Sequence, residues 1–280
     1  MKIIRTAKQM QKLACELKKQ RKTIALVPTM GCLHKGHLSL VTKAKKTAAK
    51  VIVSIFVNPT QFGPKEDFKK YPRQEKLDLQ ALEKSGADIV FLPKAADIYP
   101  NNFQTWIDVT ETTKKLCGAS RPGHFRGVTT VVLKLFNITQ PDFAIFGKKD
   151  YQQLITIKQM VRDLNVPVKI IGAKIVRESD GLALSSRNTY LNGEERIIAR
   201  RLSTALFSLK KLSQRKKLNP KAALDYLKKE ITHDKLVKID YVDCLDSLDL
   251  MPVSTIVQGK TLVAIAAFVG RTRLIDNIIL

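Results

Sequence analysis

The sequence predicts an α/β protein with a Rossmann-type, doubly wound parallel sheet, followed by a smaller α+β C-terminal domain. Strand and helix patterns alternate through residues 1–175, and such alternation is typical of right-handed βαβ units. Residues 51–57 form a nearly continuous apolar run rich in β-branched side chains, which indicates a strand buried on both faces. We therefore expect one domain at residues 1–175 and a smaller one at residues 176–280.

The individual elements follow from apolar periodicity and from the turn residues between them. Residues 128–136 suit a helix or a buried strand, because period alone does not separate the two. In the first domain we expect helices near residues 7–19, 37–49, 75–84 and 151–164, and strands near 23–27, 51–57, 88–92, 142–146 and 168–176. In the second we expect helices near 194–214 and 220–232, and two or three strands that include 239–245 and 261–269.

Composition places the chain among ordinary globular proteins. It has 280 residues, of which 44% are apolar and 26% charged. No apolar run reaches the roughly 18–20 residues that span a bilayer, and the N-terminal residues lack the apolar core of a signal peptide. We expect a cytoplasmic protein with no membrane contact. The four cysteines are far apart without a C-x-x-C pair, which argues against a zinc ribbon or a disulfide framework.

The formal net charge of +24 leaves an alternative open. Such an excess attracts anions, and nucleic acid is the obvious candidate. The lysines are spread over the whole chain, however, and no basic cluster is interleaved with the aromatic residues that stack on bases. We therefore expect a solvated, lysine-rich surface and no nucleic-acid partner.

The segment at residues 28–37, P-T-M-G-C-L-H-K-G-H, carries the strongest local signal. It lies between a predicted buried strand and a predicted helix, where backbone N–H groups and the helix dipole favour phosphate. His34 and His37 are three residues apart and should project to the same side, while Gly36 would let a ligand approach the backbone. Two imidazoles there can stabilise charge that develops on an attacked phosphate.

Zinc binding and a P-loop are the alternative interpretations of this segment. A zinc site is possible because histidine binds zinc, but no nearby cysteine or third histidine completes a shell. A P-loop is excluded, because no Lys-Ser/Thr pair follows Gly36.

Two further segments suit phosphate. Residues 146–153, F-G-K-K-D-Y-Q-Q, place two lysines at another strand-to-helix junction, with Gln153 one turn into the helix. Residues 177–188 include Ser185, Ser186 and Arg187 in a loop, and these side chains can bind phosphate through charge-assisted hydrogen bonds. The same loop could instead be a domain linker with N-cap serines for the next helix.

Together these segments resemble the pantoate–β-alanine ligase family along nearly the whole chain. The likeness includes the H-x-G-H motif, which by itself indicates only a wider nucleotidyltransferase superfamily. It also covers N-P-T-Q-F at residues 58–62, R-P-G-H-F-R-G-V at 121–128, G-K-K-D-Y-Q-Q at 147–153, residues 177–188 and R-T-R-L-I-D-N at 271–277.

The resemblance implies an AMP-forming ligase in coenzyme A precursor biosynthesis. Pantoate attacks the α-phosphorus of Mg²⁺-ATP to give pantoyl adenylate and pyrophosphate, and β-alanine then displaces AMP to give pantothenate. The first domain would bind ATP and pantoate, the C-terminal domain would act as a lid, and the protein would be a homodimer. A nucleotidyl transferase that leaves AMP on its product is the nearest alternative.

The resemblance also implies roles for individual residues. The catalytic residues would be His37, at the position described as the proton donor, His34 and Lys149. Gln61 and Gln153 would bind pantoate, and Gln61 would also meet β-alanine. No residue is expected to ligate a metal, since Mg²⁺ would be carried by ATP. The ATP-binding residues would be Met30, Gly31, Cys32, Leu33, His34, Lys35, Gly36, His37, Gly147, Lys148, Lys149, Asp150, Val176, Leu184, Ser185, Ser186 and Arg187.

Three positions depart from the family pattern. Cys32 stands where alanine is usual, Lys148 where glutamate or glutamine is common, and Leu184 where methionine is usual. Cys32 and Leu184 are small or volume-conserving changes. Lys148, which lies beside matched residues, would make the ATP site more electropositive.

Overall fold

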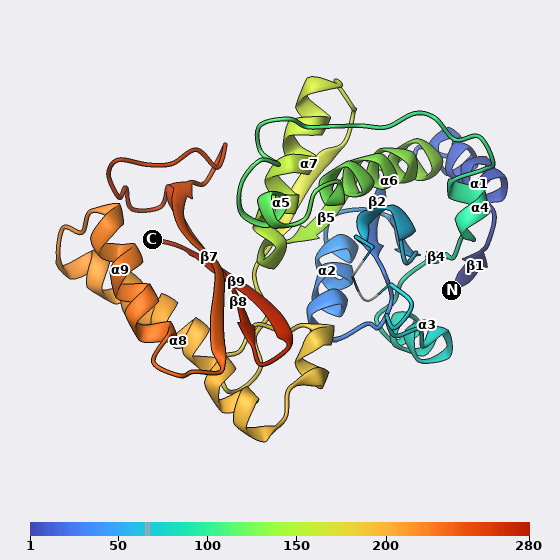
Figure 1. The fold of residues 1–280 in the computed structure, drawn as a ribbon. Coiled ribbons are helices and arrows are strands. Elements are labelled where there is room, and N and C mark those ends of the chain that lie inside the picture. Colours follow the sequence, from blue (N-terminus) through green and yellow to red (C-terminus); the bar gives the residue numbers. More distant parts are fainter. Residues whose placement is uncertain (65, 67) are drawn as a thin grey trace.

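The computed structural model describes residues 1–64, 66 and 68–280, which form two β-sheets with helices packed on them (Figure 1). Six parallel strands form the first sheet in the order β1-β4-β3-β2-β5-β6, and three antiparallel strands form the second in the order β7-β8-β9. The strands are β1 (Lys2–Ile4), β2 (Ile24–Thr29), β3 (Lys50–Ile55), β4 (Ile89–Phe91), β5 (Phe143–Gly147), β6 (Lys169–Ala173), β7 (Val237–Asp246), β8 (Thr261–Val269) and β9 (Thr272–Ile279).

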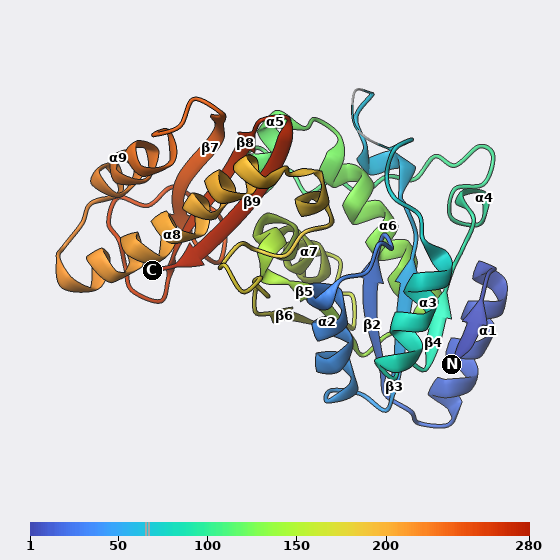
Figure 2. The ribbon, with the colours of Figure 1, turned by 90° about the horizontal axis from the view of Figure 1, so that it is seen from below.

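Helices cover both faces of the parallel sheet (Figure 2). Helices α1, α6 and α7 pack on one face, and α2 and α3 pack on the other. The α-helices are α1 (Ala7–Lys19), α2 (Lys35–Lys45), α3 (Glu75–Lys84), α4 (Ala95–Ile98), α5 (Leu116–Ser120), α6 (His124–Thr139), α7 (Tyr151–Asp163), α8 (Gly193–Arg215) and α9 (Pro220–Ile231). The 3-10 turns are η1 (Pro59–Gln61), η2 (Lys148–Asp150) and η3 (Ser186–Tyr190).

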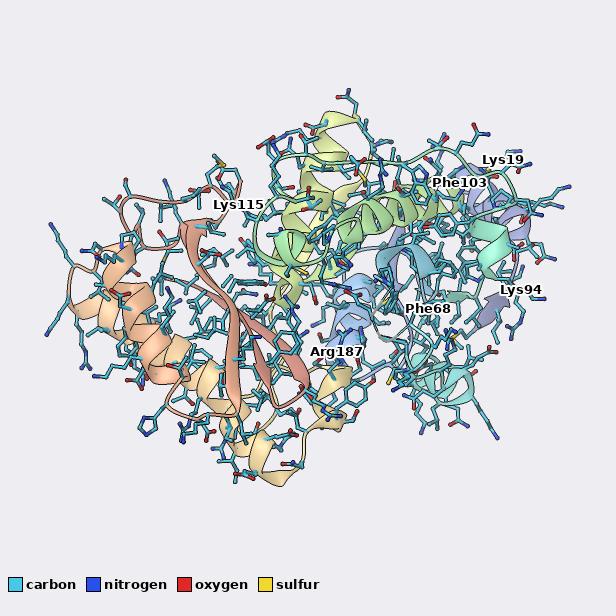
Figure 3. The ribbon with its side chains drawn as sticks, in the orientation of Figure 1. Lys19, Phe68, Lys94, Phe103, Lys115 and Arg187 are labelled. Carbon is cyan, nitrogen blue, oxygen red and sulfur yellow. The ribbon has the colours of Figure 1, made fainter. Side chains whose placement is uncertain are left out.

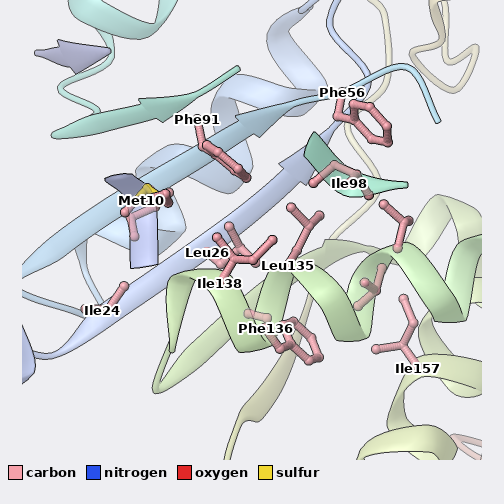
Figure 4. Packing of buried hydrophobic residues seen from close by; sticks show 14 of the residues in the cluster. Met10, Ile24, Leu26, Phe56, Phe91, Ile98, Leu135, Phe136, Ile138 and Ile157 are labelled. Carbon is pink, nitrogen blue, oxygen red and sulfur yellow. The ribbon is translucent and has the colours of Figure 1, made fainter. Parts of the chain in front are cut away.

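Alternation along the buried strands explains the two-sided core. Ile24 and Leu26 of β2 belong to the cluster under α1, α6 and α7, whereas Ala25 and Val27 belong to the cluster under α2 and α3. Figure 4 shows Leu26 facing Leu135 of α6. Because both faces are covered, each of these strands is apolar at consecutive positions. The predicted doubly wound parallel sheet is confirmed.

The structure settles three points that the sequence left open or misplaced. Residues 128–136 belong to helix α6, which begins at His124 and packs its apolar side chains on the sheet. The predicted strand at residues 51–57 ends at Ile55, since the chain turns into η1 at Pro59. Strand β1 was not predicted, because three residues are too few to show a period; it is held by parallel pairing with β4.

The order of the strands fixes where a ligand can bind. Strand β2 pairs in parallel with β3 on one side and with β5 on the other. Connections that leave β2 and β5 therefore diverge to opposite halves of the sheet, and the carboxyl ends of these two strands flank a crevice. The segments that follow them contain the H-x-G-H motif and the turn η2.

The antiparallel sheet has its own hydrophobic core, and a second apolar contact joins it to the part of the chain that forms the parallel sheet. Helices α8 and α9 pack on it through buried leucines such as Leu206 and Leu227. A smaller cluster joins it to α5 and α7, where Leu116 and Ile155 meet Leu250 and Leu262. The second sheet is thereby held beside the carboxyl end of β5.

Substitution of Gly127 by alanine should destabilise the fold. An added Cβ would lie 2.4 Å from the carbonyl oxygen of Thr60, and this oxygen belongs to backbone that cannot swing aside. We expect Gly127→Ala to lower the free energy of unfolding in urea by about 1–3 kcal/mol, the usual cost of overpacking. Gly193→Ala is the control, because a Cβ on Gly193 meets nothing within 4 Å. Equal stability of the two variants would contradict the close approach of α6 to η1.

Candidate active site

Two imidazole rings lie side by side at the N-terminal end of α2. His34 is the N-cap residue, and its Nδ1 accepts the N–H of Gly36 at 3.1 Å. Nδ1 of His37 accepts the N–H of His34 at 3.4 Å, and the two ring centroids are 4.1 Å apart. The prediction that both rings project to the same side is confirmed. Gly36 also has a role that the sequence did not reveal: a Cβ there would lie 2.7 Å from the His34 ring.

The backbone bonds determine the protonation of both rings. Because each Nδ1 accepts a hydrogen bond, the proton of the neutral ring sits on Nε2. Burial lowers the pKa of His37 to about 3, and the nearby His34 and the Lys149 ammonium add to the shift. Burial, followed by Lys149, also lowers the pKa of His34. At neutral pH both histidines are therefore uncharged hydrogen-bond donors through Nε2.

The loop before the histidines is held by a buried carboxylate from α3. Oδ2 of Asp78 accepts the N–H of Cys32 at 2.9 Å, and Oδ1 accepts the N–H of Leu33 at 2.7 Å. The loop needs such support, because Gly31 and Cys32 both have positive φ, at 83° and 52°. Asp78 is only 2% exposed, and this burial raises its pKa. Cys32 and Leu33 thus shape the loop through their backbone N–H groups, which bond to Asp78.

The turn η2 presents one of its two lysines to the histidines. Nζ of Lys149 lies 4.0 Å from the carboxylate of Asp150, and its charge lowers the pKa values of His34 and His37. The stem of Lys148 instead covers Gly172 on β6, where an added Cβ would lie 3.2 Å from Lys148 Cε. Two adjacent lysines in the sequence therefore have different surroundings.

The two glutamines that follow η2 also separate. Gln152 is buried, where its Oε1 accepts the N–H of Cys117 and its Nε2 donates to the carbonyls of Thr112 and Lys115. Gln152 therefore braces the segment before α5. Gln153 lines the cavity beside the histidines, which Gln152 does not reach.

Two cavities adjoin each other at the turn η2. The first, of about 220 Å³, extends from the H-x-G-H segment to an apolar wall on α6 formed by Val128, Val131, Val132 and Leu135. The second, of about 530 Å³, lies between η2 and the strands β7–β9. They share five lining residues, which are Lys149, Asp150, Gln153, Ser185 and Arg187. Figure 3 shows Arg187 in the loop that faces the first sheet.

Most of the site residues predicted from the sequence surround the first cavity. Its lining includes Met30, His34, Gly36, His37, Gln61, Gly147, Lys149, Asp150, Gln153, Val176, Leu184, Ser185, Ser186 and Arg187. Among the described residues, its lining does not include Gly31, Cys32, Leu33, Lys35 or Lys148.

The side chain of Gln61 is oriented by a chain of buried hydrogen bonds. Nδ2 of Asn58 donates to Gln61 Oε1 at 3.1 Å and to the carbonyl of Gly127 at 3.0 Å. Oδ1 of Asn58 accepts from the hydroxyls of Tyr99 and Thr60, each at 2.9 Å. With Oε1 used by Asn58, the Nε2 group of Gln61 faces Met30 and the cavity.

The backbone of Gln61 is held from the segment at residues 121–124. The carbonyl of Gln61 lies 2.8 Å from Nδ1 of His124 and accepts from Arg121 at 3.3 Å. Arg121 is fixed by a bidentate ion pair with Glu66, with both distances at 2.6 Å. Since Arg121 donates to His124 Nε2 at 3.1 Å, the His124 proton sits on Nδ1. Burial and Arg121 lower the pKa of His124 to about 4.

The described part of the chain offers no ready metal centre. It contains no group of three or more His, Cys, Asp or Glu side chains arranged to hold a metal ion. Within the same residues, no helix is long and apolar enough to cross a membrane.

One protein family matches this chain along almost its whole length. A family model described as pantoate-beta-alanine ligase matches residues 2–279. The chain belongs to the pantoate–β-alanine ligase family. It is 54% identical over 264 residues to the pantothenate synthetase of Thermoanaerobacter sp. (strain X514), covering 94% of this chain and 93% of that protein.

Solved structures of this family have the same fold. The crystal structure of pantothenate synthetase from Thermus thermophilus superposes with a TM-score of 0.93 at 40% identity, covering 99% of each chain. A pantoate-beta-alanine ligase from Francisella tularensis, complexed with beta-gamma ATP and beta-alanine, gives a TM-score of 0.81 at 38% identity, covering 100% of this chain and 97% of that one.

Membership of the family establishes the reaction. The enzyme is an AMP-forming ligase that condenses pantoate with β-alanine by way of pantoyl adenylate. Sequence reasoning found the groups that line the cavity, but it missed most of those that hold them in place. It did not single out Asp78 or Tyr99, and it quoted Asn58 and His124 only as parts of motifs. These residues act through contacts with segments far away in the chain, which leave no local pattern.

The protonation state of His37 can be tested by NMR. Burial disfavours the charged imidazolium and so moves the pKa downward, which keeps the ring neutral at pH 5. We expect long-range ¹H–¹⁵N spectra to show a protonated Nε2 and an unprotonated Nδ1, unchanged from pH 8 to pH 5. The signals are assigned by their loss in His37→Gln, and free histidine, with a pKa of about 6.5, is the internal reference. A midpoint above pH 6 would contradict the buried neutral state.

Proposed function

We propose that the first cavity binds ATP and pantoate together, and that His34, His37 and Lys149 act on the phosphate groups. The observation that carries this assignment is the pair of neutral Nε2–H donors beside a lysine, at the point where the strand order of the sheet reverses. Ligands of open α/β sheets bind at this point. The helix α2 directs its N-terminal end toward the same place, which favours an anion.

The chemistry follows from these charges. When a pantoate oxygen attacks the α-phosphorus, negative charge grows on the phosphate oxygens and on the leaving pyrophosphate. Neutral Nε2–H groups can donate to these oxygens without giving up a proton, and the Lys149 ammonium adds a positive charge. His37 therefore serves as a hydrogen-bond donor. Arg187, together with Ser185 and Ser186, faces the same cavity and suits the leaving pyrophosphate.

The remaining residues of the proposed ATP site either line the first cavity or shape the loops around it. Gly147, Asp150, Val176, Leu184, Gly36 and Met30 line the first cavity and would meet the nucleotide directly. Gly31, Cys32, Leu33, Lys35 and Lys148 would act by shaping the two loops.

Pantoate suits the far end of the first cavity. Its two methyl groups match the apolar wall that Val128, Val131 and Leu135 form on α6. Gln61 and Gln153 supply amide groups for its hydroxyls and carboxylate. The attacking carboxylate would then point toward the histidines.

The second cavity suits the approach of β-alanine. It meets the first one at Lys149, Gln153 and Arg187, which puts an incoming amine next to the acyl carbon of the adenylate. Its outer lining carries Arg271, and Arg273 paired with Asp240, so a carboxylate finds positive charge there. Gln61, which lines the first cavity, would contact pantoate and would also meet β-alanine.

Mg²⁺ would enter as part of the ATP substrate. Asp150 lines both cavities, and its side chain is 51% exposed, whereas the Asp78 carboxylate is occupied by two backbone N–H groups. Asp150 could supply one carboxylate to Mg²⁺, which would be held mainly by phosphate oxygens and water.

Three broader features belong to the proposal. Residues 1–175 would form the ATP- and pantoate-binding domain and residues 176–280 the lid. The enzyme would be a cytoplasmic homodimer without a nucleic-acid partner. Light scattering after gel filtration measures its mass, which should be twice 31.5 kDa.

Pantoate-dependent exchange of labelled pyrophosphate into ATP tests the whole assignment. Exchange should require pantoate and proceed without β-alanine, and free AMP should then form in proportion to the β-alanine added. The alternative based on charge would be favoured by tight binding of nucleic acid at physiological salt together with no exchange.

The two lysines of η2 should differ in this assay. Lys149→Ala removes the ammonium beside the histidines, and we expect the exchange rate to fall about 10²–10³-fold. His37→Ala should cause a loss of similar size. Lys148→Gln is the matched comparison, because the stem of Lys148 packs on Gly172. Removal of the Lys148 ammonium should change the exchange rate less than about threefold. Similar rates for the two lysine variants would remove Lys149 from the mechanism.

The hydrogen bonds around Asn58 predict that a change at Tyr99 weakens pantoate binding selectively. Tyr99→Phe removes one donor to Asn58 Oδ1, which loosens the amide that orients Gln61. We expect the KM for pantoate to rise about 2–10-fold, the scale of one net hydrogen bond, while the KM for ATP stays within twofold. Tyr226→Phe, on α9, is the control. An unchanged KM for pantoate would show that Tyr99 does not act through Gln61.

A further inference from the structure

One strand of the second sheet contacts both phosphate-facing segments. Asn277 on β9 donates through Nδ2 to the carbonyl oxygens of Lys148 and Lys149, each at 2.9 Å. The preceding residue, Asp276, forms a bidentate ion pair with Arg177, at 2.6 and 2.9 Å. Arg177 begins the loop that carries Ser185 and Arg187. Two consecutive side chains of β9 therefore hold the turn η2 and the root of that loop.

The Asn277 bonds have a chemistry that few side chains can supply. The carbonyls of Lys148 and Lys149 are two acceptors side by side, and an amide NH₂ group has two donors in matching positions. Asn277 is 6% exposed, so loss of these buried donors would take a hydrogen bond from each of the two carbonyls. The backbone N–H of Asn277 donates to Asp276 Oδ1 at 2.7 Å, which helps to fix the carboxylate that pairs with Arg177.

The turn depends on this support because of its position. Only three residues make up η2, and it joins the end of β5 to the start of α7. The orientation of its peptide groups fixes where the Lys149 side chain leaves the backbone. A rotation of these peptides would move the Lys149 ammonium away from His34 and His37.

We infer that Asn277 is a positioning residue for Lys149. The phosphate-binding turn has its reactive geometry only when strand β9 is in place against it. Adenylation therefore depends on the C-terminal sheet through one amide group, although this amide does not touch the phosphates. The inference rests on the proposed contact of Lys149 with ATP phosphate.

A double-mutant cycle with Lys149→Ala tests the inference, using the pyrophosphate exchange rate of the full-length enzyme. Asn277→Asp keeps the size of the side chain but presents oxygen atoms to the two carbonyls. We expect it to slow exchange about 10- to 100-fold in the wild-type background. In the Lys149→Ala background it should slow exchange less than about twofold further, because residues that act through one group are not additive.

Asn277→Ala serves if the aspartate variant does not fold. It removes both donors without adding charge next to Asp276, and the same non-additivity is expected. Lys115→Gln is the matched control. Lys115, labelled in Figure 3, donates through Nζ to the Leu250 carbonyl at 3.4 Å, a contact between the same two parts of the molecule that does not involve the residues of η2. Its effect should be small and should be the same factor in both backgrounds.

The outcomes separate the inference from the proposed function. If Lys149→Ala leaves exchange unchanged, the proposed role of Lys149 fails, and the inference fails with it. If Lys149→Ala is slow but the Asn277 variants slow both backgrounds by equal factors, Asn277 has an independent structural role and only the inference is overturned. Wild-type exchange in both Asn277 variants also overturns it.

Discussion

The parallel pairing of β2 with β5 is the constraint on which the site depends. Alignment of Ala25 with Phe143 and of Leu26 with Ala144 brings the carboxyl ends of the two strands together. The H-x-G-H segment and the turn η2 leave from these ends, so the two histidines and Lys149 share one crevice although they lie far apart in the sequence. A shift of this pairing would take Lys149 away from the imidazoles, whatever the local structure of either segment.

Electrostatics then follow from burial at that crevice. Loss of water around the buried imidazoles opposes their protonation, and the nearby lysine ammonium opposes it further. The histidines remain neutral, and their backbone acceptor bonds direct the remaining protons toward the cavity. The site therefore combines one fixed positive charge with two oriented neutral donors, an arrangement that stabilises growing negative charge with little reorganisation.

The residues that face the substrates are held by others that do not. Asp78 fixes the loop before the histidines, Asn58 and Tyr99 fix the amide of Gln61, and Asn277 contacts the carbonyls of η2. Each of these bonds is buried or partly buried, where an unmade hydrogen bond is costly. They also come from separate segments of the chain, so the geometry of the site depends on the packing of the fold around it.

The sequence alone determined the parallel sheet, most of its helices, the family and many of the residues that line the first cavity. These features depend on local patterns, such as apolar runs between turn residues and motifs that keep their spacing. Only the tertiary structure decided that residues 128–136 are helical, and only it showed why Lys149 and Gln153, and not their neighbours Lys148 and Gln152, face the first cavity. Adjacent identical residues have the same local pattern, and only the packing of distant segments such as β6 and α5 distinguishes them.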